Sequence, residues 1–150
     1  MVASGSGDGK ITLWDIASGL RLTSTNGHLD WVMCLAFSPD GRYLASGSAD
    51  NTVVIWNVTA LLNPDGADDS VWLQITDFSS RVWSVAFSPD GRKFAASTQD
   101  GQIRLWNMDA DTWPDRACRR ANRNLSRDEW TRFVGLDIPY HPCSSFSLRR

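Results

Sequence analysis

The sequence predicts an all-β fold built from tandem antiparallel sheets, and two regularities point to it. Residues 32–42 return almost unchanged as residues 82–92, at an offset of 50 positions, and a period of this size is typical of modular repeat arrays. An Asp also precedes a Trp by six positions three times. These pairs are Asp8 and Trp14, Asp50 and Trp56, and Asp100 and Trp106.

Each unit is expected to alternate strands with tight turns. In the middle unit, β-branched and aromatic residues predict four strands, at residues 32–37, 43–48, 52–58 and 71–76. The turn Ser38-Pro39-Asp40-Gly41 places Pro at the second position, where its fixed φ fits, and Gly at the fourth. We therefore expect each complete unit to be a four-stranded antiparallel sheet.

The spacing of the units predicts a loop in the second one. The step from Trp14 to Trp56 is 42 residues, whereas the step from Trp56 to Trp106 is 50. The extra residues fall within 59–70, a stretch that holds Pro64, Gly66 and several Asp residues. Such a composition favours a polar loop over a strand.

The third strand of each unit is apolar on two faces. Val53 and Ile55 alternate with Val54 and Trp56, and alternate side chains of a strand point to opposite sides of its sheet. A sheet that is apolar on both sides needs a neighbour on each. Tandem sheets of this kind fit blades stacked radially better than one isolated sandwich.

Several motifs resemble the WD40 repeat. They are Gly27-His28, the two Ser-Pro-Asp-Gly turns, the segment 44–50, the strand end Val54-Ile55-Trp56-Asn57 and the dipeptide Trp14-Asp15. The resemblance covers about residues 1–108 and implies a partial β-propeller of about three blades. It is joined by a C-terminal tail in which two short helices are expected.

The resemblance also implies a buried hydrogen-bond relay in the middle unit. By position its members are His28, Ser46 or Ser48, Asp50 and Trp56. In the other units the corresponding residues are Asp8 and Trp14, and Asp100 and Trp106. The third unit departs from the family pattern, because residues 76–80 replace the Gly-His pair. Its relay is therefore expected to be incomplete.

These features divide the chain into four parts. We expect an incomplete blade at 1–27, a complete WD40 blade at 28–78, a second incomplete blade at 79–108 and a helical tail at 109–150. A propeller of the family closes with about seven blades. The chain is therefore expected to be the C-terminal part of a larger propeller, and the alternative is that copies of the chain complete one another.

The tail carries two helix-start signals, Thr112-Trp113-Pro114-Asp115 and Ser126-Arg127-Asp128-Glu129. It resembles the terminal extension of bacterial WD40 proteins, some of which carry a STAND-type nucleotide-binding domain or a serine/threonine kinase. This resemblance implies a bacterial origin and a sensor architecture. Cys118 and Cys143 form a possible thiol pair that could close a disulfide or share a metal with His141; separate thiols are the alternative.

Composition and charge narrow the function. The formal net charge is −2. The three cysteines are widely spaced, and this spacing favours a reducing, cytoplasmic location. The N-terminal residues are polar and Gly-rich, so we expect no signal segment and no membrane partner. Neither His28 nor His141 has a nucleophile at a recognisable spacing, so we expect no enzyme, no catalytic residue, no cofactor and no metal. The tail arginines are expected to be solvated, not bound to nucleic acid.

What remains is binding, and the sequence predicts a protein-interaction or ligand-sensing scaffold. The resemblance implies that partners dock on one rim of the blades, formed here by Asp30, Trp31, Asn51, Ser79, Arg81, Trp83 and Gln99. Trp and Arg often anchor interfaces, although Trp31 and Trp83 could equally pack between blades. Two alternative functions stay open: a regulatory sensor segment of a signalling ATPase or kinase, and a stand-alone homo-oligomer.

Overall fold

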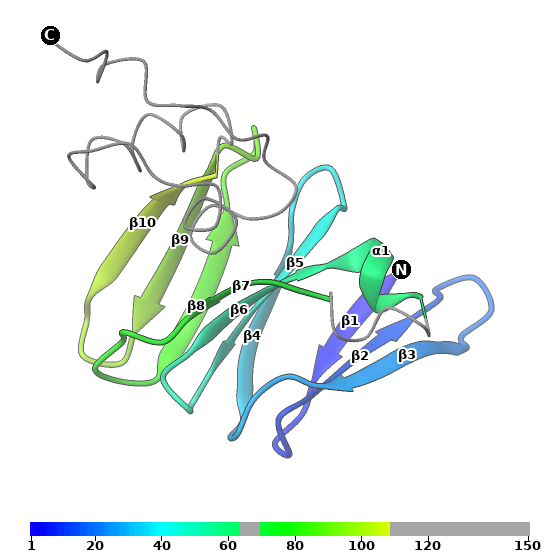
Figure 1. The fold of residues 1–150 in the computed structure, drawn as a ribbon, viewed down its shortest axis with the longest axis horizontal. Coiled ribbons are helices and arrows are strands. Elements are labelled where there is room, and N and C mark those ends of the chain that lie inside the picture. The colour runs from blue at the N-terminus through cyan, green and yellow to red at the C-terminus, as the bar shows by residue number, and fades with distance from the viewer. Residues whose placement is uncertain (64–69, 109–150) are drawn as a thin grey trace, which may run out of the picture. The chain divides into compact units, whose positions relative to one another are not determined.

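A computed structural model of the chain describes residues 1–63 and 70–108. In this part of the chain ten β-strands form three antiparallel sheets, accompanied by one short helix. Figure 1 shows the strands of each sheet side by side. We call the sheets blade 1 (β1 to β3), blade 2 (β4 to β7) and blade 3 (β8 to β10). The predicted all-β class is confirmed.

Blade 1 has three strands in the order β1-β2-β3. They are β1 (Val2–Gly5), β2 (Lys10–Trp14) and β3 (Arg21–Asn26). The turn between β1 and β2 contains Gly9 at φ +80°. A Cβ at that position would lie 2.1 Å from the His28 carbonyl oxygen, so the turn requires glycine.

Blade 2 has four strands in the order β4-β5-β6-β7. They are β4 (Val32–Phe37), β5 (Tyr43–Ser48), β6 (Val53–Asn57) and β7 (Val71–Ile75). The bounds of β4 and β5 agree with the sequence prediction, and β6 and β7 are slightly shorter than predicted. In the turn between β4 and β5, the Ser38 hydroxyl donates to Asp40 over 2.6 Å.

The predicted loop at 59–70 is wrong at its start, because α1 (Val58–Leu61) follows β6 directly. The Asn57 side chain caps this helix by accepting a hydrogen bond from the Ala60 amide over 3.2 Å. Val58 and Leu61 are buried, so apolar packing favours a helical turn over the predicted loop. Residues 64–69 lie outside the described residues.

Blade 3 has three strands in the order β10-β9-β8. They are β8 (Val82–Phe87), β9 (Lys93–Thr98) and β10 (Ile103–Asn107). Its first strand repeats a detail of blade 2. The register shifts between Val82 and Ser84 in β8, as it does between Val32 and Cys34 in β4. Such bulges re-aim the side chain they contain, and the bulged residue of blade 3 is Trp83.

Blades 1 and 2 share an apolar core. Ile11 and Leu13 of β2 pack with Val54 and Trp56 of β6, and with Leu44 and the two buried residues of α1. All of these side chains are at most 7% exposed. Each fully buried aliphatic side chain contributes roughly 1.5–3 kcal/mol, so this junction is a major source of stability.

The chain divides into two compact units, Met1–Trp106 and Asn107–Arg150. The first contains the three sheets up to the penultimate residue of β10. Residues 109–150 lie outside the described residues, and with them both predicted tail helices, Cys118, Cys143 and His141. Within the described residues, no helix has the length and apolar character needed to cross a membrane.

Candidate functional site

The centre of blade 2 is a hydrogen-bond relay around a fully buried imidazole. His28 Nε2 lies 2.7 Å from the Ser46 hydroxyl, and Trp56 Nε1 donates to the same hydroxyl over 2.9 Å. On the other side of the ring, His28 Nδ1 lies 3.1 Å from Asp50 Oδ2. The structure therefore brings together His28, Ser46, Asp50 and Trp56, which are distant in sequence.

When His28 is neutral, each hydrogen bond of the relay has a donor and an acceptor. Burial lowers the pKa of His28, and the nearby Asp50 carboxylate only partly opposes this effect. The Asp50 carboxylate can only accept, so a proton on Nδ1 is donated to it; Nδ1 also lies 2.9 Å from the Thr52 hydroxyl, and Nε2 is hydrogen-bonded to the Ser46 hydroxyl. That hydroxyl in turn accepts the Trp56 indole proton, so each group has a partner.

Asp50 ties the turn after β5 to the loop before β4. Its carboxylate accepts from the Leu29 amide over 2.9 Å and from the Thr52 amide over 3.0 Å. Burial alone would raise the pKa of Asp50, but the hydrogen bonds from Thr52 and Leu29 outweigh it, and the pKa is lowered. The Ser48 hydroxyl accepts from the Asp50 amide over 3.1 Å and donates to the Asp30 carbonyl over 3.2 Å.

Blade 1 repeats only half of this arrangement. Trp14 Nε1 donates to the Ser4 hydroxyl over 2.9 Å, as Trp56 does to Ser46. Asp8 instead forms an exposed ion pair with Lys10 at 2.9 Å. The predicted pair Asp8 and Trp14 therefore has separate sets of hydrogen-bond partners.

Blade 3 replaces the relay by aromatic packing. Counting 50 positions from His28 and Ser46 gives Phe78 and Ala96. The rings of Phe78 and Phe94 lie 5.9 and 5.6 Å from that of Trp106. When both members of a buried polar pair become apolar, neither leaves an unsatisfied group. The predicted departure of this unit thus takes the form of a coordinated apolar substitution.

Asp100 still holds the turn of blade 3. Its carboxylate accepts from the Thr98 and Ser79 hydroxyls, the latter over 2.8 Å, and from Gln102 Nε2 over 2.9 Å. The Thr98 hydrogen bond is the main reason why the pKa of Asp100 is held far below its ordinary value, with the Ser79 bond next. Asp100 and Trp106, paired in the sequence pattern, therefore contact different residues.

Sequence reasoning missed a contact between β10 and the segment before β8. Arg104 donates to the Asp77 carboxylate over 2.6 Å and to the Asp77 carbonyl over 3.1 Å. The guanidinium carbon also lies 4.9 Å from the centre of the Phe78 ring. The sequence contained a sign of this contact, because a charged residue, Arg104 of β10, stands where the equivalent strand β6 has the apolar Val54.

The candidate rim presents large exposed side chains. Leu29 is 98% exposed, Trp31 62% and Trp83 50%. The Trp31 indole lies beside Gly7 of blade 1, because a Cβ on that glycine would be 3.5 Å from Trp31 Nε1. Asp30 accepts from the Trp31 amide over 2.7 Å. Trp31 thus has both features considered from the sequence: it contacts a neighbouring blade and is exposed.

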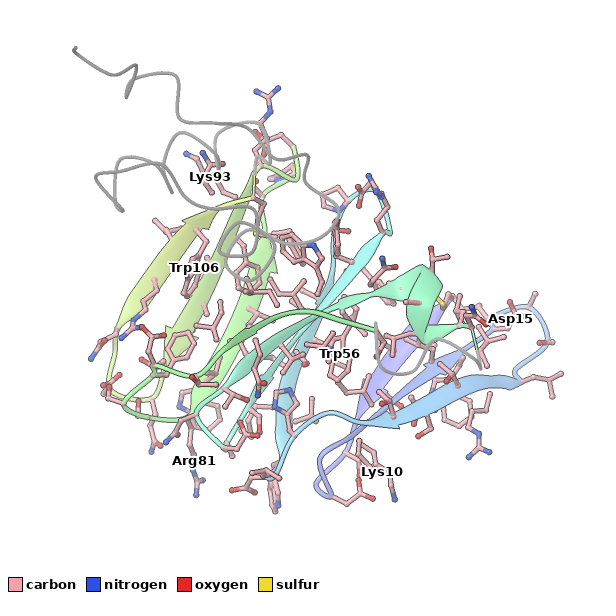
Figure 2. The ribbon with its side chains drawn as sticks, viewed as in Figure 1. Lys10, Asp15, Trp56, Arg81, Lys93 and Trp106 are labelled. Atoms are coloured by element: carbon pink, nitrogen blue, oxygen red, sulfur yellow. The ribbon has the colours of Figure 1, made fainter. Side chains whose placement is uncertain are left out.

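One backbone contact at the rim of blade 3 repeats a contact of blade 2. The Gln99 amide donates to the Arg81 carbonyl over 2.9 Å, just as the Ala49 amide donates to the Trp31 carbonyl. Asn51 is half-buried at φ 66°, and Ser79 is exposed but bound to Asp100. Figure 2 shows Arg81 and Lys10 projecting from one end of the sheets, away from Lys93.

Catalytic or metal chemistry gains no support from the geometry. Within residues 1–63 and 70–108, no three His, Cys, Asp or Glu side chains are grouped so that they could hold a metal ion. Cys34 of β4 is half-buried, and burial raises the pKa of its thiol to about 11. A thiol in that state is a poor nucleophile. The described residues of the three sheets are instead arranged to present a binding surface.

Three stacked antiparallel sheets with a Trp-centred relay define a propeller-type repeat protein. The family profile described as "WD domain, G-beta repeat" matches residues 19–57 and 72–107, which is half of the chain. The chain therefore belongs to the WD40 repeat family.

Similar proteins cover short parts of the chain. The nuclear distribution protein PAC1 of Tuber melanosporum is 47% identical over 58 residues, which is 39% of this chain and 13% of that protein. The pre-rRNA-processing protein IPI3 of Mycosarcoma maydis is 42% identical over 64 residues, or 43% of this chain and 11% of that protein. The protein groucho of Drosophila melanogaster is 35% identical over 78 residues, which is 52% of this chain and 10% of that protein.

Two facts about these relatives bear on the predictions. The chain spans only 10–13% of their length. They are also eukaryotic, so they lend no support to the resemblance with bacterial sensor proteins, which stays a prediction.

Proposed function

We propose that this chain is a non-catalytic protein-interaction scaffold that binds protein or peptide partners on the predicted rim, around Trp31, Arg81 and Trp83 and the neighbouring Leu29. The observation that carries the proposal is the exposure of three large apolar side chains at this rim. Trp and Arg are enriched among the residues that dominate binding energy. Large apolar side chains exposed on a folded protein can mark an interaction site.

The relay supports this proposal by fixing the rim backbone. Asp50 holds the Leu29 amide, and the Ala49 amide holds the Trp31 carbonyl. Because the exposed side chains stand on backbone that is already ordered, binding loses less conformational entropy. The buried polar groups therefore support recognition without contacting the partner themselves.

The names of the relatives are compatible with a shared module. They refer to nuclear distribution in one case and to pre-rRNA processing in another, and WD40 repeat proteins are generally non-enzymatic. For this chain we propose two kinds of protein partner: peptides at the rim, and further blades of a propeller at the faces of the end sheets. A cytoplasmic location stays a prediction that rests on the cysteine pattern.

The rim can be tested with alanine variants of the full chain. Trp31→Ala and Trp83→Ala should each reduce the recovery of bound proteins at least about tenfold in quantitative affinity purification, because an interface anchor typically contributes about 2 kcal/mol or more. Ile16→Ala is the matched control, since Ile16 is 69% exposed on the β2–β3 hairpin of blade 1. Unchanged recovery with both Trp variants would contradict the proposed rim.

A further inference from the structure

The indole ring of Trp31 turns one of its faces toward blade 1. A Cβ on Gly7, in the turn between β1 and β2, would lie 3.5 Å from Trp31 Nε1 and 3.6 Å from both Cδ1 and Cε2. Nε1 is bonded to the other two atoms, so a point at the edge of the ring would be clearly closer to Nε1 than to its neighbours. The nearly equal distances therefore place Gly7 over the face of the ring.

The backbone on either side of this ring is held by hydrogen bonds. The Val32 amide donates to the Ser6 carbonyl of the blade 1 turn over 3.1 Å. The Ala49 amide of blade 2 donates to the Trp31 carbonyl over 2.9 Å. Because the ring stands on ordered backbone, a ligand that stacks on it loses less conformational entropy on binding.

The opposite face of the indole is open. Trp31 is 62% exposed although its first face is turned to Gly7. Among residues 1–63 and 70–108, no second aromatic ring and no cation stacks on it. The face of an indole ring attracts cations that lie within about 6 Å of its centre.

The charges beside this face favour a cation as its ligand. Asp30 Oδ1 accepts from the Trp31 amide over 2.7 Å, which holds the carboxylate next to the base of the indole. Asp30 takes part in none of the three ion pairs between described residues. Asp8, which follows Gly7, is neutralised by Lys10 at 2.9 Å. The uncompensated negative charge therefore belongs to Asp30, and it attracts positively charged groups to the open face.

The equivalent position of blade 3 has the opposite chemistry. Arg81 stands 50 positions after Trp31, and Ala49 stands where blade 1 has Gly7. Arg81 is exposed and forms no ion pair within the described part of the chain. A guanidinium repels a second cation, so only the junction between blades 1 and 2 combines an open indole face with a carboxylate.

We propose that the open face of Trp31, together with the Asp30 carboxylate, binds an arginine or lysine side chain of a partner peptide. An apolar side chain would use the ring but leave the carboxylate without a counter-charge, and an acidic side chain would be repelled by it. This inference rests on the proposed scaffold function and names the chemistry of the partner at one position of the rim.

Peptide pools of defined charge test the proposal with the immobilised full chain. The probes are dye-labelled random hexapeptides with one fixed central residue, which is arginine, lysine, citrulline or norleucine. Citrulline and norleucine are neutral counterparts of arginine and lysine with similar shapes. The arginine and lysine pools should be retained about two- to fivefold more than their neutral counterparts, as expected for a cation on an exposed ring. Equal retention of charged and neutral pools would overturn the proposal.

Variants at position 31 separate the ring from its apolar area. Trp31→Phe keeps an aromatic face and should keep part of the preference for charged pools, whereas Trp31→Leu should abolish it. Trp83→Leu is the matched control, because Trp83 is the other exposed Trp of the predicted rim and is 50% exposed. A preference that survives Trp31→Leu, or one that is lost equally in Trp31→Phe and Trp31→Leu, would overturn the role of the ring.

The carboxylate is tested with the same pools. Asp30→Asn keeps an oxygen that can accept from the Trp31 amide and removes only the charge. The preference for the charged pools should weaken, and it should weaken less at high salt, where the charge is already screened. An unchanged preference at low salt would overturn the role of Asp30.

The two proposals can fail separately. If Trp31→Ala and Trp83→Ala lose their protein partners but the pools show no preference for charge, the scaffold function stands and the cation site falls. If the pools show the preference through Trp31 while both alanine variants keep every partner, the rim is wrong as the surface for those partners and the cation site stands.

Discussion

At the scale of single residues, blades 2 and 3 fill equivalent positions with different chemistry. Blade 2 places His28 and Ser46 beside Trp56, and blade 3 places Phe78 and Ala96 beside Trp106. The hydrogen-bond relay of blade 2 needs all of its residues, because a buried polar group left without a partner costs about 1–3 kcal/mol. The aromatic cluster of blade 3 needs only that its rings pack together.

This difference predicts what happens when relay residues of blade 2 are replaced by the apolar residues of blade 3. His28→Ala should lower the free energy of unfolding by about 2–4 kcal/mol, because Asp50 and Ser46 both lose a partner. The double variant His28→Phe and Ser46→Ala should be more stable than His28→Ala, as it reproduces blade 3. Denaturant titration measures each value, and a double variant no better than His28→Ala would contradict the interpretation.

A pH dependence follows from the buried imidazole. Because the folded state lowers the pKa of His28 below its ordinary value of 6.5, the unfolded chain binds more protons in that range. The free energy of unfolding should therefore fall as the pH drops below about 6.5. The lowered pKa of Asp50 adds a second loss only below its ordinary value of 3.8.

The measurement compares unfolding curves between about pH 7.5 and 5. The variant with His28→Phe and Ser46→Ala serves as the control, because the buried imidazole is the only titratable group it loses and His141 is kept. The slope with pH should be smaller in the control than in the unmodified chain. Identical slopes would show that His28 does not titrate differently on folding.

At the scale of elements, the strands were more predictable than the segments between them. The repeats and the β-branched and aromatic residues located the four strands of blade 2, with β4 and β5 at their observed bounds. The helix α1 was not predicted, because Val58 and Leu61 are buried only once the core shared by blades 1 and 2 has formed. Burial of a short segment depends on tertiary packing, which local composition does not report.

The candidate site was predictable to a similar extent. The family pattern singled out His28, Ser46, Asp50 and Trp56, and these residues lie together. It did not choose between Ser46 and Ser48, since both lie in one strand two residues apart and only the packed structure determines which faces the ring. The Arg104 contact with Asp77 required knowing that β10 meets the preceding connector.

That contact gives a prediction at the level of blade 3. Arg104→Met keeps a long side chain but removes an ion pair whose Asp77 side is 72% exposed. The expected loss is about 1 kcal/mol or less, and the stability of the unmodified chain should fall more between about 0.05 and 1 M NaCl than that of the variant. Lys93→Met on β9 is the control, and an equal salt response in all three chains would contradict a role for the pair.

At the scale of the whole molecule, the blades resemble successive members of a stack. Val32 and Val82 each pack on a glycine of the preceding blade, Gly5 and Gly47. Among the described residues, the large apolar side chains at the junctions between blades are buried. The surface that we propose for partners is the rim, where exposed apolar side chains stand on hydrogen-bonded backbone.

Hydrogen–deuterium exchange of the chain, alone and in complex with proteins purified with it from cells, tests this account most directly. Binding should slow exchange at residues 29–31 and 81–83 on the rim. The exposed β2–β3 hairpin around Ile16 should remain unchanged. A rim that exchanges as fast in the complex as in the free chain would contradict the account.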